Sequence, residues 1–130
     1  MANWNSLASS SYDAALLLMK QPGKERSAIS RAYYAVYSRI THALVLRGVT
    51  FMVRGVKRGN PSHAALPALV ENHLQVLGQH RWVVANCMRA LYRLRVTADY
   101  FPVSQVNAEI ADKAIALITK IFVLTKGVVD

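Results

Sequence analysis

The sequence has 130 residues, a length typical of one domain, and 53% of them are hydrophobic, which is enough for a single core. Sixteen Lys and Arg against seven Asp and Glu leave a net charge of +9. Such a charge attracts polyanions, for example nucleic acid, nucleotide phosphates or an acidic protein. The alternative, that the basic residues only form solvated helix faces, explains the charge equally well. The single cysteine, Cys87, excludes an intrachain disulfide and a thiolate metal cluster, so we expect a cytoplasmic protein without a metal or a cofactor. Lysines interrupt the longest apolar stretches, so we expect no transmembrane helix.

Helical periodicity first appears over residues 6–20. No basic stretch precedes this apolar run, as it would in a secretory signal peptide, so we expect the segment to belong to the folded domain. Gln21-Pro22-Gly23 then ends the helix, because proline lacks a backbone donor and glycine accepts left-handed dihedral angles.

A second helix is predicted over residues 27–47, and Gly48 ends it. Its apolar side chains recur every three or four residues and predict a broad face turned towards a core. These positions are Ile29, Ala32, Tyr33, Val36, Tyr37, Ile40, Ala43 and Leu44. Tyr33, Tyr34 and Tyr37, with Val36 and Ile40, provide more apolar helix face than four helices of this length need, so we expect a homodimer.

Residues 48–60 contain three glycines and no sustained period, which predicts a flexible basic loop without a regular strand, in which Phe51, Met52 and Val53 can make a brief extended or packed turn. A third helix is expected near Asn60-Pro61, where Asn can cap and Pro suits the first helical position. Pro67 leaves two alternatives: a helix kinked there, or a short turn before a helix that begins at Leu66. Gly78 is expected to end this helix.

A fourth helix is predicted over residues 81–100, and a fifth runs from a cap at Ser104 to Lys126. Four long amphipathic helices joined by short turns are typical of an up-and-down bundle. The fold class is therefore all-α, a four-helix bundle with an extra short helical piece, in a single domain over residues 1–130.

A candidate phosphate- or nucleotide-binding site combines faces of two helices. On the second helix, Arg31 and Tyr34 share one side with Ser38 and His42, opposite the core. Arginine and tyrosine together can hold a phosphate and stack a base. The alternative is that Tyr34 packs against a neighbouring helix while Arg31 is merely solvated.

The fourth helix contributes Arg95 and Asp99, whose i,i+4 spacing lets their side chains meet. Asp99 can then orient an arginine towards a phosphate, while the tyrosine hydroxyls add uncharged donors. We therefore expect one cluster of Arg31, Tyr34, Arg95, Asp99 and Tyr100 where the two helices face each other. The alternative is an ion pair between Arg95 and Asp99 that only fixes helix packing.

Two stretches of the chain resemble the HEPN-domain family. Residues 30–37, S-R-A-Y-Y-A-V-Y, resemble its S-R-x-Y-Y-A-x-[FY] stretch, and residues 91–100, L-Y-R-L-R-V-T-A-D-Y, resemble its L-Y-x-L-R-x-x-A-D-Y stretch. The predicted order of helices agrees, so the resemblance covers most of the chain. It implies a helical bundle that forms dimers and is often encoded beside a small nucleotidyltransferase.

The resemblance also implies a reaction. Many HEPN proteins are metal-independent ribonucleases of toxin–antitoxin or phage-defence systems, in which an Arg and a nearby His act on RNA through its 2′-hydroxyl. This chain departs from that pattern, because no histidine follows His80 and Arg95 therefore lacks a downstream partner. The one pair with the family's separation is Arg58 and His63, which we retain as weak catalytic candidates.

The expected function is RNA or nucleotide binding by a HEPN-like protein of a toxin–antitoxin or phage-defence type, without the standard Arg/His pair. One alternative is an active, metal-independent endoribonuclease with a variant site. A second alternative is a non-catalytic partner of a nucleotidyltransferase. The sequence leaves open whether the protein is an enzyme.

Overall fold

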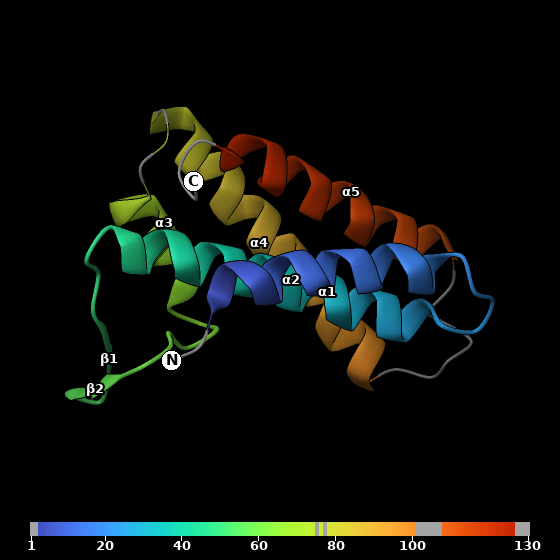
Figure 1. Ribbon diagram of the computed structural model, residues 1–130, viewed down its shortest axis with the longest axis horizontal. Coiled ribbons are helices and arrows are strands. Elements are labelled where there is room, and N and C mark those ends of the chain that lie inside the picture. The colour runs from blue at the N-terminus through green and yellow to red at the C-terminus, as the bar shows by residue number, and fades with distance from the viewer. Residues whose placement is uncertain (1–2, 75, 77, 101–107, 127–130) are drawn as a thin grey trace.

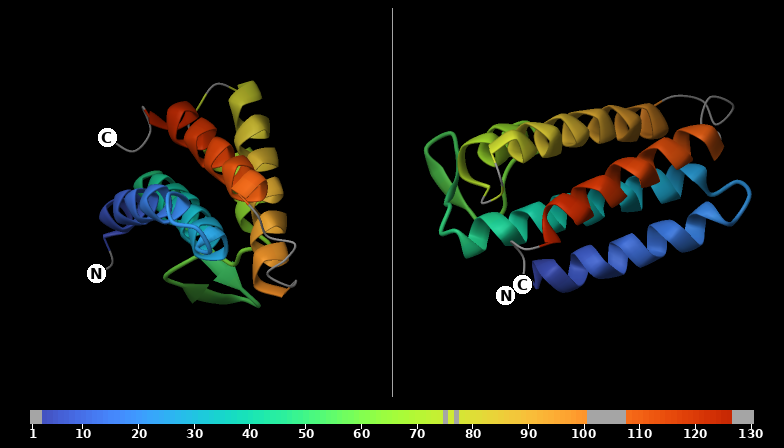
Figure 2. Two further views of the ribbon diagram at one scale, coloured as in Figure 1. Left: turned by 90° about the vertical axis from the view of Figure 1, so that its right-hand side faces the viewer. Right: turned by 90° about the horizontal axis from the view of Figure 1, so that it is seen from above.

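The computed structural model describes residues 3–74, 76, 78–100 and 108–126, and helices dominate it (Figure 1). Its four long helices are α1 (Trp4–Met19), α2 (Glu25–Leu46), α4 (Gly78–Tyr100) and α5 (Ala108–Leu124). Successive long helices run in opposite directions, and the short helix α3 (Leu66–His73) packs against α4 (Figure 1, Figure 2). The predicted all-α bundle with an extra short helical piece is therefore confirmed.

The helix α2 lies at the centre of the bundle, packed against α1, α4 and α5. All of its predicted core positions are buried, because a 3.6-residue period keeps them on one side of the helix. Tyr33 and Tyr37 are only 3% and 4% exposed within the single chain, whereas Tyr34 is 39% exposed. The expected surplus of apolar surface is therefore wrong, and the homodimer stays a prediction without that support.

The end of α2 shows why Gly48 stands where it does. Gly48 has a φ of +82°, which a residue without Cβ adopts at little cost. In this conformation the Gly48 N–H bonds to the Val45 carbonyl at 3.0 Å, and the Val49 N–H bonds to the Leu44 carbonyl at 3.1 Å. These two bonds satisfy carbonyl groups that the last helical turn would leave unpaired.

The segment after α2 forms a small hairpin, so the expectation of a loop without strands is wrong. Strand β1 (Phe51–Val53) pairs antiparallel with β2 (Val56–Arg58), and Phe51 is buried. The two residues of the turn, Arg54 and Gly55, have φ values of +52° and +77°, as in the primed turns that join strands tightly. Arginine rarely adopts a positive φ, so the pair Arg54-Gly55 did not signal a hairpin.

The connection to the fourth helix resolves the alternatives at Pro67. A short turn precedes α3, which begins at Leu66, and Pro67 occupies the first turn, where its missing N–H costs nothing. The expected end of this helix at Gly78 is wrong: α3 ends at His73, and the Arg81 side chain donates a 2.6 Å bond to the Leu74 carbonyl just beyond it. Gly78 instead begins α4.

The fifth helix was expected to begin at a cap on Ser104, which lies outside the described residues. In the part of the chain that is described, no helix combines the length and apolarity needed to cross a bilayer.

Candidate functional site

Two core tyrosines of α2 fasten the chain between the hairpin and α3. The Tyr37 hydroxyl donates to the Pro61 carbonyl at 2.6 Å and accepts a 3.0 Å bond from Asn60 Nδ2. One turn earlier, the Tyr33 hydroxyl lies 2.7 Å from His63 Nδ1. Tyrosines serve here because they place an apolar ring in the core and a polar atom at its edge. The result is that His63 is held against the side of α2.

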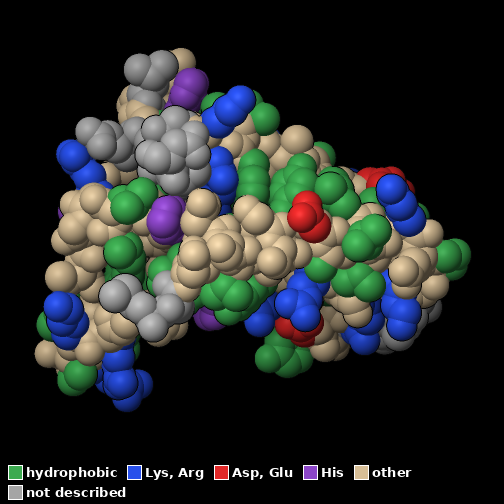
Figure 3. All heavy atoms as spheres, in the orientation of Figure 1, with side chains coloured by type: hydrophobic (Ala, Val, Ile, Leu, Met, Phe, Trp, Pro, Cys, Tyr) green, Lys and Arg blue, Asp and Glu red, His purple; other side chains and the backbone are tan. Residues whose placement is uncertain are grey.

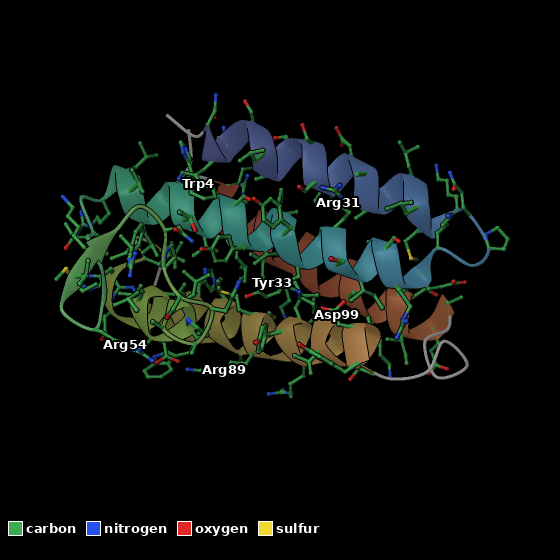
Figure 4. All side chains as sticks on the ribbon, turned by 90° about the horizontal axis from the view of Figure 1, so that it is seen from below. Trp4, Arg31, Tyr33, Arg54, Arg89 and Asp99 are labelled. Carbon is green, nitrogen blue, oxygen red and sulfur yellow. The ribbon has the colours of Figure 1, made fainter. Side chains whose placement is uncertain are left out.

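An aromatic cluster joins this segment to α4. The rings of His63 and Tyr92 are stacked, with centroids 6.1 Å apart and planes 16° from parallel, and Tyr33 lies 5.5 Å from Tyr92. The Arg95 guanidinium lies over the Tyr33 ring, 4.8 Å from its centroid. Figure 4 shows Tyr33 between α2 and α4, with Arg31 on the other side of α2. Three separate segments thus meet around one tyrosine.

The electrostatic environment keeps both hydrogen-bonded groups of this cluster neutral at pH 7. Burial raises the pKa of the Tyr33 hydroxyl, and the nearby Arg95 charge opposes that shift only in part. Burial, followed by the same Arg95 charge, lowers the pKa of His63 below its ordinary value of 6.5. With the imidazole proton on Nε2 the Tyr33 hydroxyl donates to Nδ1, and with the proton on Nδ1 the hydroxyl accepts.

Two cavities open on either side of the contact between Arg95 and Tyr33. The first, here called the Arg31–Arg95 cavity, has a volume of about 300 Å³ and is lined by Ser27, Ser30, Arg31, Tyr34 and Arg95. The second, here called the His63–Tyr92 cavity, has a volume of about 200 Å³ and is lined by Tyr33, His63, Ala64, Pro67, Met88, Arg89, Tyr92 and Arg93.

The structure gathers three of the five residues expected in the binding cluster. Arg31, Tyr34 and Arg95 line one cavity, and Asp99 reaches it through Arg95, with 3.5 Å between Arg95 Nε and Asp99 Oδ2. Tyr100 is not part of the cluster: it is 81% exposed and lines neither cavity. It is the last residue of α4.

One further expectation needs correction. Ser38 does not continue the exposed face of Arg31 and Tyr34, because it is fully buried. Arg58 lies exposed in β2, opposite Phe51, and the described residues show no hydrogen bond between it and His63, so the weak catalytic pair stays a prediction.

The sequence did not indicate several side chains that line the two cavities, among them Ser27, Ser30, Tyr33 and Tyr92. Ser27 and Ser30 lie one turn before Arg31 and Tyr34, so helical spacing was a usable signal. Tyr92 lies three residues before Arg95 and offered a similar signal. Tyr33 belonged to the core stripe, and nothing in its spacing showed that its hydroxyl would reach His63.

The charges around the cavities are not all equally available to a ligand. Arg89 Nη2 is paired with Glu71 at 2.8 Å, and its Nη1 bonds to Asn86 at 3.1 Å. Arg31 is exposed on the surface of α2. Among the described residues, no group of three or more His, Cys, Asp and Glu side chains is placed to hold a metal ion. The arrangement thus offers guanidinium groups, hydroxyls and aromatic rings.

Comparison of the chain with known protein families, with curated proteins and with solved structures finds no match.

Proposed function

We propose that this protein binds RNA or a nucleotide through the Arg31–Arg95 cavity, lined by α2 and α4, and the His63–Tyr92 cavity, lined mainly by α4 and by residues in and just before α3. One observation carries the proposal: guanidinium groups from two different helices and three hydroxyl groups line the same cavity of about 300 Å³. Guanidinium groups bind phosphate through paired, charge-assisted hydrogen bonds, and hydroxyls donate without adding charge. The volume lies at the lower end of the range for ligand sites and suits a phosphate with its sugar.

The second cavity is suited to the base. Its walls include the stacked rings of His63 and Tyr92, and bases stack on such rings with little regard to sequence. Arg95 lines the first cavity and lies over Tyr33, which lines the second. A phosphate and the base next to it can therefore occupy the two cavities together.

The resemblance to the HEPN family supports the same proposal from the sequence. Its two stretches, residues 30–37 and 91–100, supply Arg31, Tyr34 and Arg95. The same resemblance is the basis for proposing a toxin–antitoxin or phage-defence setting, a homodimer and a nucleotidyltransferase partner.

The proposal is tested by the fluorescence anisotropy of a labelled single-stranded RNA titrated with protein at several salt concentrations. We expect binding that weakens steeply with salt, because neutralised phosphates release counterions. Arg31→Ala should weaken binding about tenfold, which is the lower range of one charge-assisted hydrogen bond. The matched control is Arg54→Ala, which removes the same charge from the hairpin turn. If both variants lose the same affinity, net charge alone explains the binding, and the proposed binding site is wrong.

A second candidate, ribonuclease activity, is favoured by the position of His63. Its Nδ1 bonds to Tyr33, which leaves Nε2 for proton transfer, and Arg95 lies over the same Tyr33 ring, where it can stabilise charge on a phosphate. Attack of the 2′-hydroxyl would leave a 2′,3′-cyclic phosphate and a 5′-hydroxyl.

Incubation of labelled RNA with the protein, with and without chelator, tests this candidate. Cleavage that survives chelation and disappears in His63→Ala supports a ribonuclease, whereas intact RNA that stays bound supports binding alone. The absence of both binding and cleavage favours the remaining alternative, a non-catalytic partner of a nucleotidyltransferase.

A further inference from the structure

A groove of about 500 Å³ lies between α4 and α5, apart from the two cavities described above. The two helices lie side by side in both views of Figure 2. The groove is lined by Ala90, Arg93, Leu94, Lys113, Ala116, Leu117 and Lys120. Four of these residues are apolar and three are cations; the apolar set is here called the floor and the cationic set the rim.

The charges of the rim all have the same sign. Among the described residues that line the groove, three are cations and none is acidic. One of the cations, Lys113, has an acidic partner in Glu109, whose Oε1 lies 4.0 Å from Lys113 Nζ, and both side chains are mostly exposed. An exposed pair at that distance contributes little, so the rim keeps its positive field. Figure 3 shows that basic side chains also exceed acidic ones on the adjoining face.

We propose that this α4–α5 groove is the docking site for an acidic amphipathic helix of a partner protein. Two antiparallel helices leave a groove into which a third helix packs through ridges of side chains. Ala90 and Ala116 have short side chains that let a helix approach, while Leu94 and Leu117 offer apolar contact. Asp and Glu on the flanks of that helix would meet Lys113 and Lys120.

Charge complementarity decides against a second copy of this chain as the occupant. The chain carries a net charge of +9, and a two-fold contact through the groove would set its cationic rim against an identical one. Like charges brought together at an interface oppose association. An acidic helix has the opposite charge and covers the same apolar floor.

The test uses two fluorescein-labelled helical peptides of about 14 residues, or four turns, with Leu and Ala on one face. One peptide has Glu on its flanks, and the other has Lys at the same positions. The protein variants are Lys113→Glu with Lys120→Glu, and a control pair, Lys24→Glu with Lys57→Glu, which makes the same charge change at exposed positions outside the groove. Arg93 stays unchanged because it borders the His63–Tyr92 cavity as well.

We expect the natural chain to bind the Glu peptide at least about tenfold more tightly than the Lys peptide, and the groove pair of substitutions to remove most of that preference. The control pair should change the affinity by less than about twofold. Leu117→Asp, with its fold checked by circular dichroism, should also weaken binding because it makes the floor polar. Equal affinity for the two peptides, or equal loss in the groove and control pairs, would overturn the proposal.

Discussion

Arg39 and Arg95 both pack over an aromatic ring, but the donors of Arg39 are bonded to the protein, whereas Arg95 lines an open cavity. Each places its guanidinium over an aromatic ring of a neighbouring helix, Arg39 at 4.4 Å from the Phe122 centroid and Arg95 at 4.8 Å from the Tyr33 centroid. Arg39 also donates from Nε to the Thr125 hydroxyl at 2.7 Å and from Nη2 to the Phe122 carbonyl at 3.2 Å. Arg95 has a longer contact, 3.5 Å to Asp99, and lines an open cavity.

The difference shows how to separate an arginine that holds a fold from one that can hold a ligand. Arg39 satisfies a carbonyl group at the end of α5, where a positive charge also suits the helix dipole. Its donors are directed at the protein itself. Arg95 stands at the wall of a cavity, beside a tyrosine whose hydroxyl contacts an imidazole.

The largest expected effect is on stability. Arg39→Ala should lower the free energy of unfolding by about 2–3 kcal/mol, because two charge-assisted contacts and a cation–π contact are lost at once. Urea unfolding followed by circular dichroism measures this value. Arg39→Lys is the matched control, since it keeps the charge and loses the planar fork. A loss below about 0.5 kcal/mol, the usual range of surface substitutions, would mean that Arg39 does not stabilise the fold and that the contrast with Arg95 is wrong.

Arg95→Ala should do the reverse of Arg39→Ala. We expect it to weaken the binding of RNA by about 1–3 kcal/mol, as for one charge-assisted hydrogen bond, while the stability changes little because the Asp99 pair is partly exposed. Asp99→Asn should weaken binding less, since it only alters how Arg95 is oriented. Thermal melts run beside anisotropy titrations separate the two effects. A large fall in melting temperature with unchanged binding would make Arg95 a second packing arginine.

The hydroxyl of Tyr33 provides a smaller and sharper test. Tyr33→Phe keeps the ring beneath Arg95 but removes the 2.7 Å bond to His63, which should cost about 1 kcal/mol of stability. It turns the ring under Arg95 into the same ring that lies under Arg39. Tyr34→Phe, at an exposed position of the same helix, should leave the urea midpoint nearly unchanged. If the two variants have the same midpoint, the bond to His63 contributes nothing to folding.

The smallest expected effect is a pH dependence of the free energy of unfolding that arises from His63, in the cluster with Arg95, and has no counterpart around Arg39. His63 has a lowered pKa in the fold, so the unfolded chain binds a proton more readily. The contribution of neutral His63 to the stability of the fold is therefore complete above pH 6.5, the ordinary pKa of histidine. That contribution is lost as the pH falls through the lowered pKa of His63 in the fold. Urea unfolding at pH 7.5 and at about pH 5 should show a smaller decrease in His63→Gln than in the natural chain. Identical decreases would place the pH dependence elsewhere.

Much of the architecture could be predicted from the spacing of side chains alone. All eight predicted core positions of α2 are buried, because a helix repeats every 3.6 residues whatever it packs against, but Ala28, Ala35, Ser38 and Thr41 are buried as well. The choice at Pro67 was narrowed to two alternatives by the chemistry of proline. The hairpin was missed, because Arg54 adopts a positive φ that the pairing of Phe51 with Arg58 imposes from outside the turn.

The candidate site, too, could be predicted only in part from the sequence. Helical spacing brought Arg31, Tyr34 and Arg95 into one expected cluster, and they do line one cavity. It also included Tyr100, which is exposed and lines neither cavity. Spacing along one helix predicts which side chains share a face, but it cannot show which face a second helix covers.

What the sequence determined by itself is therefore the set of helices, their buried faces and the excess of positive charge. The tertiary structure decided which arginine is used for packing and which lines a cavity. Arg39 and Arg95 are the same residue type on similar amphipathic helices, and they are distinguished by their contacts: Arg39 bonds to Thr125 and Phe122, whereas Arg95 has a longer contact to Asp99 and lines a cavity. Those contacts depend on how helices far apart in the chain cross, because a hydrogen bond is strong only within a few tenths of an ångström of its optimum.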